Sequence, residues 1–263
     1  MSENKQLLKQ LNATDAEIEA FTLRLERFLN KALTKALKAL EDETSKKRPN
    51  AQRTAQALGG LQSALLEAGL LKELRELEKI YGVQLREINS YLSSVVGENN
   101  ILNDLDFEIA EQLIKFDTKQ IANKVYAITD DLSSVIMRQV ISGESPDTRG
   151  LIDKFGSRTA SNIKTELNTA TIAFSRSVTQ RKADELGLKY YIYVGALDKL
   201  TRPFCRSRIG KVYTWDEIEK WDNGQGLPAT IYLGGYNCRH DLRPISNERA
   251  KELGYGDKDS SED

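Results

Sequence analysis

The residues best suited to chemistry in this chain are its two cysteines and its one histidine. Cys238 and His240 stand two apart in the stretch GGYNCRH, and the other cysteine is Cys205. If this stretch is extended, side chains two apart point to the same face, so the thiol and the imidazole converge. Thiolate and imidazole are ligands that suit zinc, and Asp198 or Asp241 offers an oxygen as a fourth ligand.

The same residues allow other interpretations. Cys205 and Cys238 can form a disulfide, which a reducing cytosol disfavours. Two small buried cysteines and a hydrogen-bonded histidine can also pack together without a metal. A catalytic pair would need Cys205 with His240, because neighbours two apart on a strand lie about 6 to 7 Å apart at their Cα atoms, too far for a direct hydrogen bond.

A metal-dependent nuclease or hydrolase built on the Cys/His cluster is the enzymatic alternative. However, the sequence contains no nucleophile elbow, Walker loop, dinucleotide fingerprint or paired-histidine zinc motif. We therefore expect a protein that is not an enzyme.

Arginines and aromatic residues are interleaved in this region, a pattern typical of surfaces that bind nucleic acid or acidic proteins. The arginines are Arg202, Arg206, Arg208, Arg239 and Arg243. Nearby aspartates and glutamates largely balance them, so we expect internal salt bridges.

The composition sets limits on partners and compartment. The chain has 263 residues with 38 Lys and Arg against 39 Asp and Glu, a formal net charge of −1, so no global field draws it to nucleic acid or to an acidic membrane. It shows no long apolar run and no signal peptide at its start. We expect no membrane partner and a cytosol-like compartment.

The pattern of elements predicts an α+β fold, with a long, mainly helical N-terminal part and a small α+β C-terminal domain of short antiparallel strands. Residues 1–43 read as an amphipathic helical arm that begins at a capping box, Thr14 to Glu17, and carries an apolar stripe from Ile18 to Leu40. A basic linker at 44–50 separates this arm from a helical region over 51–149. An apolar stripe on a surface helix more commonly packs on the protein's own core, but the linker makes this arm separable, and we expect it to order on a partner.

Within the helical region, Gly59, Gly60 and Gly82 favour division into shorter helices, and residues 97–100 break the pattern. Further helices are expected to begin near Asn103, at Asp117 and at Thr159. Gly143 suits a left-handed C-terminal cap, Ser145 suits an N-cap before Pro146, and Gly187 ends the last long helix.

The C-terminal third has a different character. Residues 189–194 and 212–214 favour strands, and Thr214 favours a helix over 215–221. Extended segments are expected at 230–233 and 238–242. The acidic tail over 248–263 is expected to be disordered.

Two runs in this third match a known family. The run TELNTATIAFSRSVTQRKADELGLKYYIYVGALDKLTRPFCRSRIGKVYT and the later LGGYNCRHDLRPI resemble the phage Mu F-like family of minor head proteins, also called the phage head morphogenesis domain. The resemblance covers about residues 150–244, and the domain that it implies spans 150–247. The matching positions are Thr165, Glu166, Asp198, Thr201, Arg202, Pro203, Cys205, Gly210, Lys211, Val212, Asn237, Cys238, Arg239, His240 and Pro244.

The resemblance implies a minor structural protein of a tailed-phage or prophage head. Such a protein associates with the portal protein and the capsid interior in multiple copies per virion, and acts in head morphogenesis or early DNA delivery. It implies a location in the virion near the portal, in the host cytoplasm during assembly, and contact with phage DNA as a further candidate.

Many members carry cysteine and histidine motifs that look like a zinc site. This chain departs from them, because Arg202 stands where a first cysteine occurs, Gly235 where a histidine occurs and His240 where a final cysteine occurs. The resemblance makes Glu166, Asp198, Thr201, Arg202, Asn237 and Arg239 motif residues, and zinc is the candidate cofactor.

Overall fold

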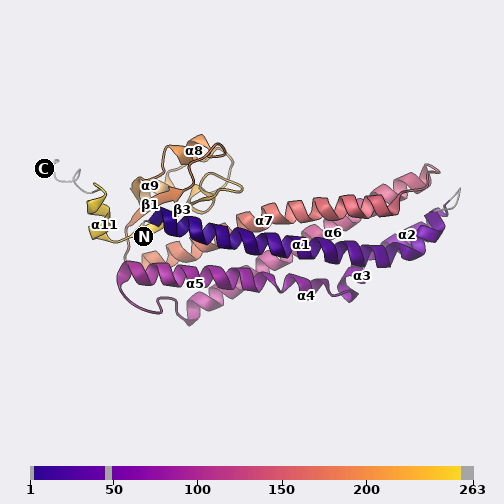
Figure 1. Ribbon diagram of the computed structural model, residues 1–263, viewed down its shortest axis with the longest axis horizontal. Coiled ribbons are helices and arrows are strands. Elements are labelled where there is room, and N and C mark those ends of the chain that lie inside the picture. The colour runs from indigo at the N-terminus through magenta and orange to yellow at the C-terminus, as the bar shows by residue number, and fades with distance from the viewer. Residues whose placement is uncertain (1–2, 45–48, 256–263) are drawn as a thin grey trace. The chain divides into compact units, whose positions relative to one another are not determined.

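The computed structural model describes residues 3–44 and 49–255, and within the first helix it describes the side chains of residues 14–38. The described chain is helical through its first two thirds and mixed afterwards (Figure 1). The α+β class expected from the sequence is confirmed. The long helical part comprises α1 (Glu3–Thr44), α2 (Ala51–Gly59), α3 (Leu61–Glu67), α4 (Leu70–Leu74), α5 (Leu77–Val96), α6 (Asp104–Ile141) and α7 (Thr148–Glu185).

The remaining elements are short. They are β1 (Tyr190–Gly195), α8 (Pro203–Arg206), β2 (Val212–Thr214), α9 (Trp215–Glu219), α10 (Ala229–Tyr232), β3 (His240–Ile245) and α11 (Asn247–Glu252).

The chain forms two compact units. The sheet unit takes the described parts of Met1–Glu17, Ile80–Ile114 and Leu167–Asp263, and the helical unit takes those of Ile18–Lys79 and Lys115–Glu166. The units therefore do not follow the expected segments 1–43, 51–149 and 150–247, because each long helix belongs partly to one unit and partly to the other. No helix among the described residues is long and apolar enough to span a membrane.

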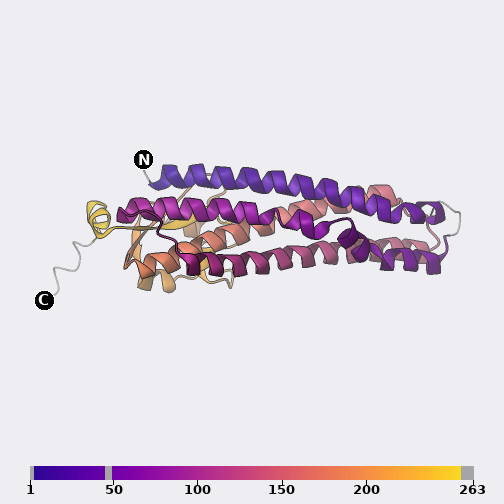
Figure 2. The ribbon, with the colours of Figure 1, turned by 90° about the horizontal axis from the view of Figure 1, so that it is seen from below.

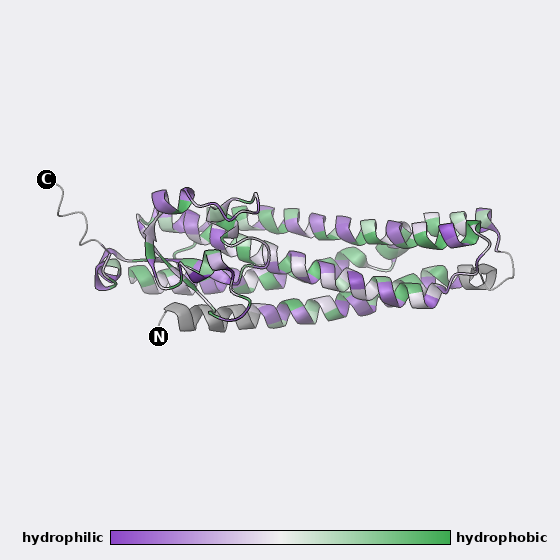
Figure 3. Cartoon of the chain, turned by 90° about the horizontal axis from the view of Figure 1, so that it is seen from above, coloured by the Kyte–Doolittle hydropathy of each residue, from purple (hydrophilic) through white to green (hydrophobic). Residues whose placement is uncertain are grey.

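In the helical unit, the apolar stripe of α1 is buried. Ile18, Leu25 and Leu37 are almost fully enclosed, and hydrophobic and hydrophilic residues recur along each helix (Figure 3). Lys164 of α7 pairs with Glu19 of α1, and Figures 1 and 2 show these helices side by side. The stripe thus packs on the protein's own core, which corrects the expectation of a separable arm; Leu40 lies outside the described side chains.

Three expected helix starts lie inside longer helices. Thr14 is interior to α1, where its buried hydroxyl accepts a hydrogen bond from the Gln84 side chain. Asp117 is interior to α6. Thr159 is interior to α7 and donates to the carbonyl of Phe155. A threonine hydroxyl that finds a partner in this way does not have to cap a helix.

The glycine breaks follow the sequence more closely. Gly97, Gly143 and Gly187 have positive φ angles of 78°, 80° and 69°, the left-handed conformation that suits the end of a helix. Gly69, with φ of 104°, adds a break that the pattern did not predict, whereas Gly82 is interior to α5. At the start of α7, the expected cap Ser145 is replaced by Asp147, whose Oδ1 accepts from Gly150 N at 3.0 Å.

Within the described residues of the sheet unit, three strands form one antiparallel sheet in the order β2-β1-β3. The aromatic and β-branched residues of β1 favour this central position, in which Tyr193 faces Leu242 and Gly195 faces His240. Alternate residues of β1 enter two cores. Tyr191 and Tyr193 join the core that holds both cysteines, and Ile192 and Val194 join the opposite one.

Two C-terminal expectations need correction. Residues 229–232 form α10 directly after Pro228, so the segment expected to be extended at 230–233 is mostly a helical turn. Ser246 caps α11, and the ring of Tyr255 packs against Tyr190 at 5.2 Å. Residues 248–255 are therefore ordered by a cap and a ring contact, while 256–263 lie outside the described residues.

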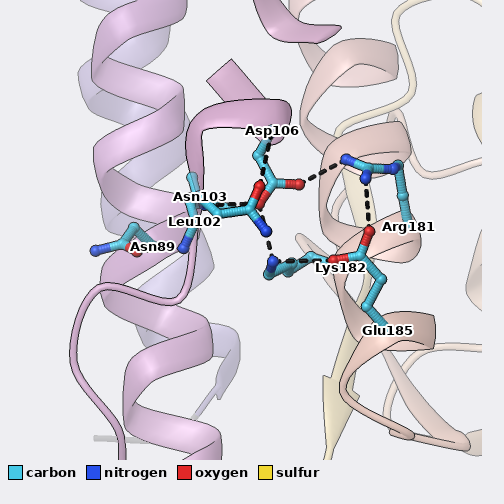
Figure 4. A network of polar contacts seen from close by, with 7 residues as sticks. All are labelled: Asn89, Leu102, Asn103, Asp106, Arg181, Lys182 and Glu185. Atoms are coloured by element: carbon cyan, nitrogen blue, oxygen red, sulfur yellow. Dashed lines mark hydrogen bonds and ion pairs between the residues drawn. The ribbon is translucent and has the colours of Figure 1, made fainter. Parts of the chain in front are cut away.

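A buried polar network joins α6 to α7 inside the sheet unit (Figure 4). Asp106 accepts from Lys182 Nζ at 2.9 Å and from Arg181 at 2.6 Å, and its side chain is 1% exposed. Asn103 and Asp106 also exchange hydrogen bonds between their side chains and backbone amides, which caps the start of α6. Glu185 contacts both basic side chains at the rim of the network.

Candidate metal site

Cys205, Cys238 and His240 meet in the buried core of the sheet unit. The two sulfur atoms lie 3.7 Å apart, and Cys238 Sγ lies 3.7 Å from His240 Nδ1. All three candidate ligand atoms lie within 4.8 Å of one another, and the residues are 1%, 4% and 3% exposed. Both cysteines are free thiols.

The expectation that Cys238 and His240 are too far apart for direct contact is corrected by this geometry. That distance applies to two residues on one strand, but β3 begins only at His240. Cys238 precedes it, after Asn237 with a positive φ of 54°. The direction of the Cys238 side chain is therefore not fixed by the alternation of side chains along a strand, and its thiol contacts the imidazole.

Two glycines make room for these groups. A Cβ on Gly234 would lie 2.5 Å from Cys205 Sγ and 3.4 Å from Cys238 Sγ, and one on Gly195 would lie 2.3 Å from His240 Cδ2. Both positions therefore exclude any side chain while the cluster keeps its arrangement. The first member of the glycine pair in GGYNCRH forms part of the wall around the sulfur atoms.

A backbone carbonyl orients the His240 ring. Nε2 lies 2.9 Å from the carbonyl oxygen of Ala196. Because a carbonyl only accepts, Nε2 carries a proton, and Nδ1 is the ring nitrogen that faces the Cys238 sulfur. Metal-binding histidines commonly have this arrangement, in which the second ring nitrogen donates to a carbonyl or carboxylate.

The two thiols have different proton affinities. The hydrogen bond from Cys205 lowers the pKa of Cys238; burial opposes this effect, whereas His240 and Arg176 add to it. The hydrogen bond to Cys238 and burial raise the pKa of Cys205. The contact between the two sulfur atoms therefore favours ionisation of Cys238 over ionisation of Cys205.

Arg176 of α7 clamps the segment that carries two of these residues. Its buried guanidinium donates to the carbonyls of Ile231 at 2.7 Å, Cys238 at 3.0 Å and His240. It also lies 3.6 Å from the carboxylate of Asp241. One side chain therefore fixes the backbone of both Cys238 and His240.

The expected oxygen ligands lie elsewhere. Asp198 pairs with Arg239 at 2.6 Å and accepts from Leu200 N and the Thr201 hydroxyl, so it is not part of the cluster. Asp241 pairs with Arg243 at 3.0 Å. The cluster supplies three ligands from the protein, two thiols and one imidazole.

The motif residues have structural contacts. Arg202 donates to the carbonyls of Gly234 and Tyr236, at 2.9 and 2.8 Å, and Thr169 Oγ1 accepts from the backbone N–H of Asn237 at 3.3 Å. Glu166 belongs to the helical unit, where it pairs with Lys124 at 2.8 Å. Of the other arginines, Arg206 and Arg208 donate mainly to backbone carbonyls, so the expected salt bridges account for only part of the set.

Side chains beside the cluster were not predicted. Arg176 and Tyr193 reach it from α7 and β1, and no local pattern in the sequence marks either residue. The donor set, with its ligand atoms within 4.8 Å of one another, and the oriented imidazole together fit a metal ion. Comparisons with protein-family models, curated proteins and solved structures found no match to the chain.

Proposed function

We propose that the protein is a minor structural protein of a tailed-phage or prophage head, and that Cys205, Cys238 and His240 hold a structural zinc ion. The observation that carries the proposal is the contact between the two halves of the family motif. Arg202 binds the carbonyl of Gly234, 32 positions away, and Asp198 pairs with Arg239, 41 positions away. If the two parts of the motif define one fold, their residues must contact each other, and these contacts support the proposal for that reason.

Zinc is the metal that this donor set favours. Two thiolates balance the charge of Zn²⁺, and sulfur together with imidazole excludes the hard cations that prefer oxygen. All three residues are buried, which suits a structural site better than one that must admit a polynucleotide. This burial also argues against the alternative of a metal-dependent nuclease or hydrolase.

Gly234→Ala tests the site sterically. The added Cβ would meet the Cys205 sulfur at 2.5 Å, and Gly234 is not among the glycines with positive φ, so alanine brings no backbone strain. We expect metal binding to weaken by at least about 100-fold, more than the loss of an outer-shell partner causes. Equilibrium dialysis with Zn²⁺ measures this affinity.

Gly59→Ala is the matched control, because a Cβ there meets nothing within 4 Å. It should bind zinc like the wild type. Unchanged affinity in Gly234→Ala would place the metal away from these sulfur atoms.

The head function predicts binding to the portal protein encoded in the same phage or prophage genome. We propose that the exposed leucines on the 196–201 loop make this contact, because Leu197 and Leu200 are 62% and 79% exposed and flank the motif residue Asp198. The double variant Leu197→Ser with Leu200→Ser should keep the fold and lose the portal in an affinity pull-down.

Leu71→Ser is the matched control, since Leu71 is 54% exposed in the helical unit. It should bind the portal protein normally. A wild-type protein that neither binds the portal protein nor occurs in purified heads by mass spectrometry would overturn the head function, whatever the zinc content.

A further inference from the structure

Tyr193 has a buried hydroxyl without an ordinary partner. Its side chain is 0% exposed in the centre of β1, and its oxygen has no hydrogen bond of normal geometry within the described structure. Tyrosines that are fully buried usually bond through their hydroxyl. An unsatisfied group at this position therefore calls for a specific explanation.

The surroundings of Tyr193 place it beside the candidate metal site. It shares one buried core with Cys205 and Cys238, and its ring lies 5.6 Å from the ring of His240. The hydroxyl also interacts with the Cys205 thiol. A phenol carries its proton at neutral pH, so this hydroxyl can donate a hydrogen bond.

We infer that Tyr193 is a positioning residue that donates a hydrogen bond to the Cys205 sulfur when this sulfur binds a metal. The inference rests on the zinc site proposed above. A metal-bound cysteine is a thiolate, which accepts hydrogen bonds more strongly than the neutral thiol. A metal-bound Cys205 would thus give the hydroxyl a stronger acceptor than the neutral thiol does, so the hydroxyl contributes more to metal affinity than to the metal-free fold.

Tyr193→Phe tests this role, because it removes one oxygen and keeps the ring. Tyr191→Phe is the matched control, since Tyr191 lies on the same strand and in the same buried core. Co²⁺ serves as the probe, with the sulfur-to-cobalt absorption band as the spectroscopic signature and chelator competition as the measure of affinity. We expect Tyr193→Phe to weaken Co²⁺ binding by about 10- to 100-fold and to shift the band, and Tyr191→Phe to do neither.

Urea unfolding of the metal-free proteins separates this role from a purely structural one. Removing an unsatisfied hydroxyl should leave the midpoint of metal-free Tyr193→Phe unchanged or higher than that of the wild type. A lower midpoint, or wild-type Co²⁺ affinity, would overturn the role of Tyr193 while the zinc site stands. A folded wild type that binds no Co²⁺ would overturn both proposals about the site.

Discussion

Replacing Asp106 with asparagine is expected to destabilise the sheet unit by about 3 kcal/mol, because removing one partner of a buried ion pair leaves the other charge uncompensated. Lys182 Nζ lies 2.9 Å from Asp106, and its side chain is only 6% exposed. Asparagine keeps the shape and one oxygen that accepts from the backbone N–H of Asn103, but it loses the charge and the acceptor for Arg181, so the loss reports on the ion pairs. Urea unfolding followed by tryptophan fluorescence measures it in this unit, because both Trp215 and Trp221 lie there.

Glu185→Gln is the control for Asp106→Asn. Glu185 contacts the same two basic side chains but is 38% exposed, so water screens its charge and the cost should be under about 1 kcal/mol. Equal losses of unfolding free energy in the two variants would show that the buried charge of Asp106 stabilises the unit no more than the exposed charge of Glu185.

The same network sets a pH dependence. Burial raises the pKa of Asp106, but the hydrogen bond from Asn103 and the contacts with Lys182 and Arg181 outweigh it, so the net pKa lies below the ordinary 3.8. Its stabilisation is therefore complete above pH 3.8 and is lost as the pH falls through the folded-state pKa. Unfolding midpoints measured from pH 6 to pH 2 should fall less steeply in Asp106→Asn than in the wild type.

Lys182 has the opposite dependence. Burial lowers its pKa, but Asp106 and Glu185 raise it by more, so the net pKa lies above 10.5. The contribution of Lys182 to the free energy of unfolding is complete below pH 10.5, and it is lost as the pH rises through the folded-state pKa.

Arg176→Met is the second large effect that we expect, with a loss of about 3 to 5 kcal/mol in the sheet unit. Methionine fills much of the volume but leaves the carbonyls of Ile231, Cys238 and His240 without their common donor. Because two of these residues are metal ligands in the proposed site, zinc affinity should also fall by about 10- to 100-fold. Arg176→Lys keeps the charge but not the planar guanidinium, so its stability and zinc affinity should lie between those of the wild type and of Arg176→Met.

Arg158→Met is the control for Arg176→Met, because Arg158 is exposed on the same helix. Its effect should stay within about 0.5 kcal/mol. Unfolding and zinc affinity at wild-type values in Arg176→Met would contradict the clamp.

The sequence predicted elements where local physical preferences and tertiary packing agree. The glycines at 97, 143 and 187 ended helices as expected, and the residues of β1 and β2 formed strands. The predictions failed where tertiary contacts determine the local structure. Thr159 has the chemistry of a cap, yet α7 continues through it because the hydroxyl bonds within the helix. The segment 230–233 favours a strand by composition, but Pro228 and the packing around it give a helical turn.

The sequence predicted which residue types form the candidate site, but not which neighbouring side chains surround them. Two cysteines and one histidine in a chain poor in both are visible in the sequence, and the structure brings these three together. Asp198 had the right chemistry for a ligand, but Arg239 takes its carboxylate. Arg176 and Tyr193 reach the cluster only through the packing of α7 and β1 on residues distant in the chain, so no spacing marks them.

The zinc content of the protein tests the central claim most directly. The wild type and Cys238→Ser should be purified without chelator and analysed for zinc by elemental analysis, with circular dichroism to confirm folding. A structural site predicts about one zinc per wild-type chain and almost none in Cys238→Ser. A folded wild-type protein without zinc, or a variant that keeps the full amount, would contradict the account.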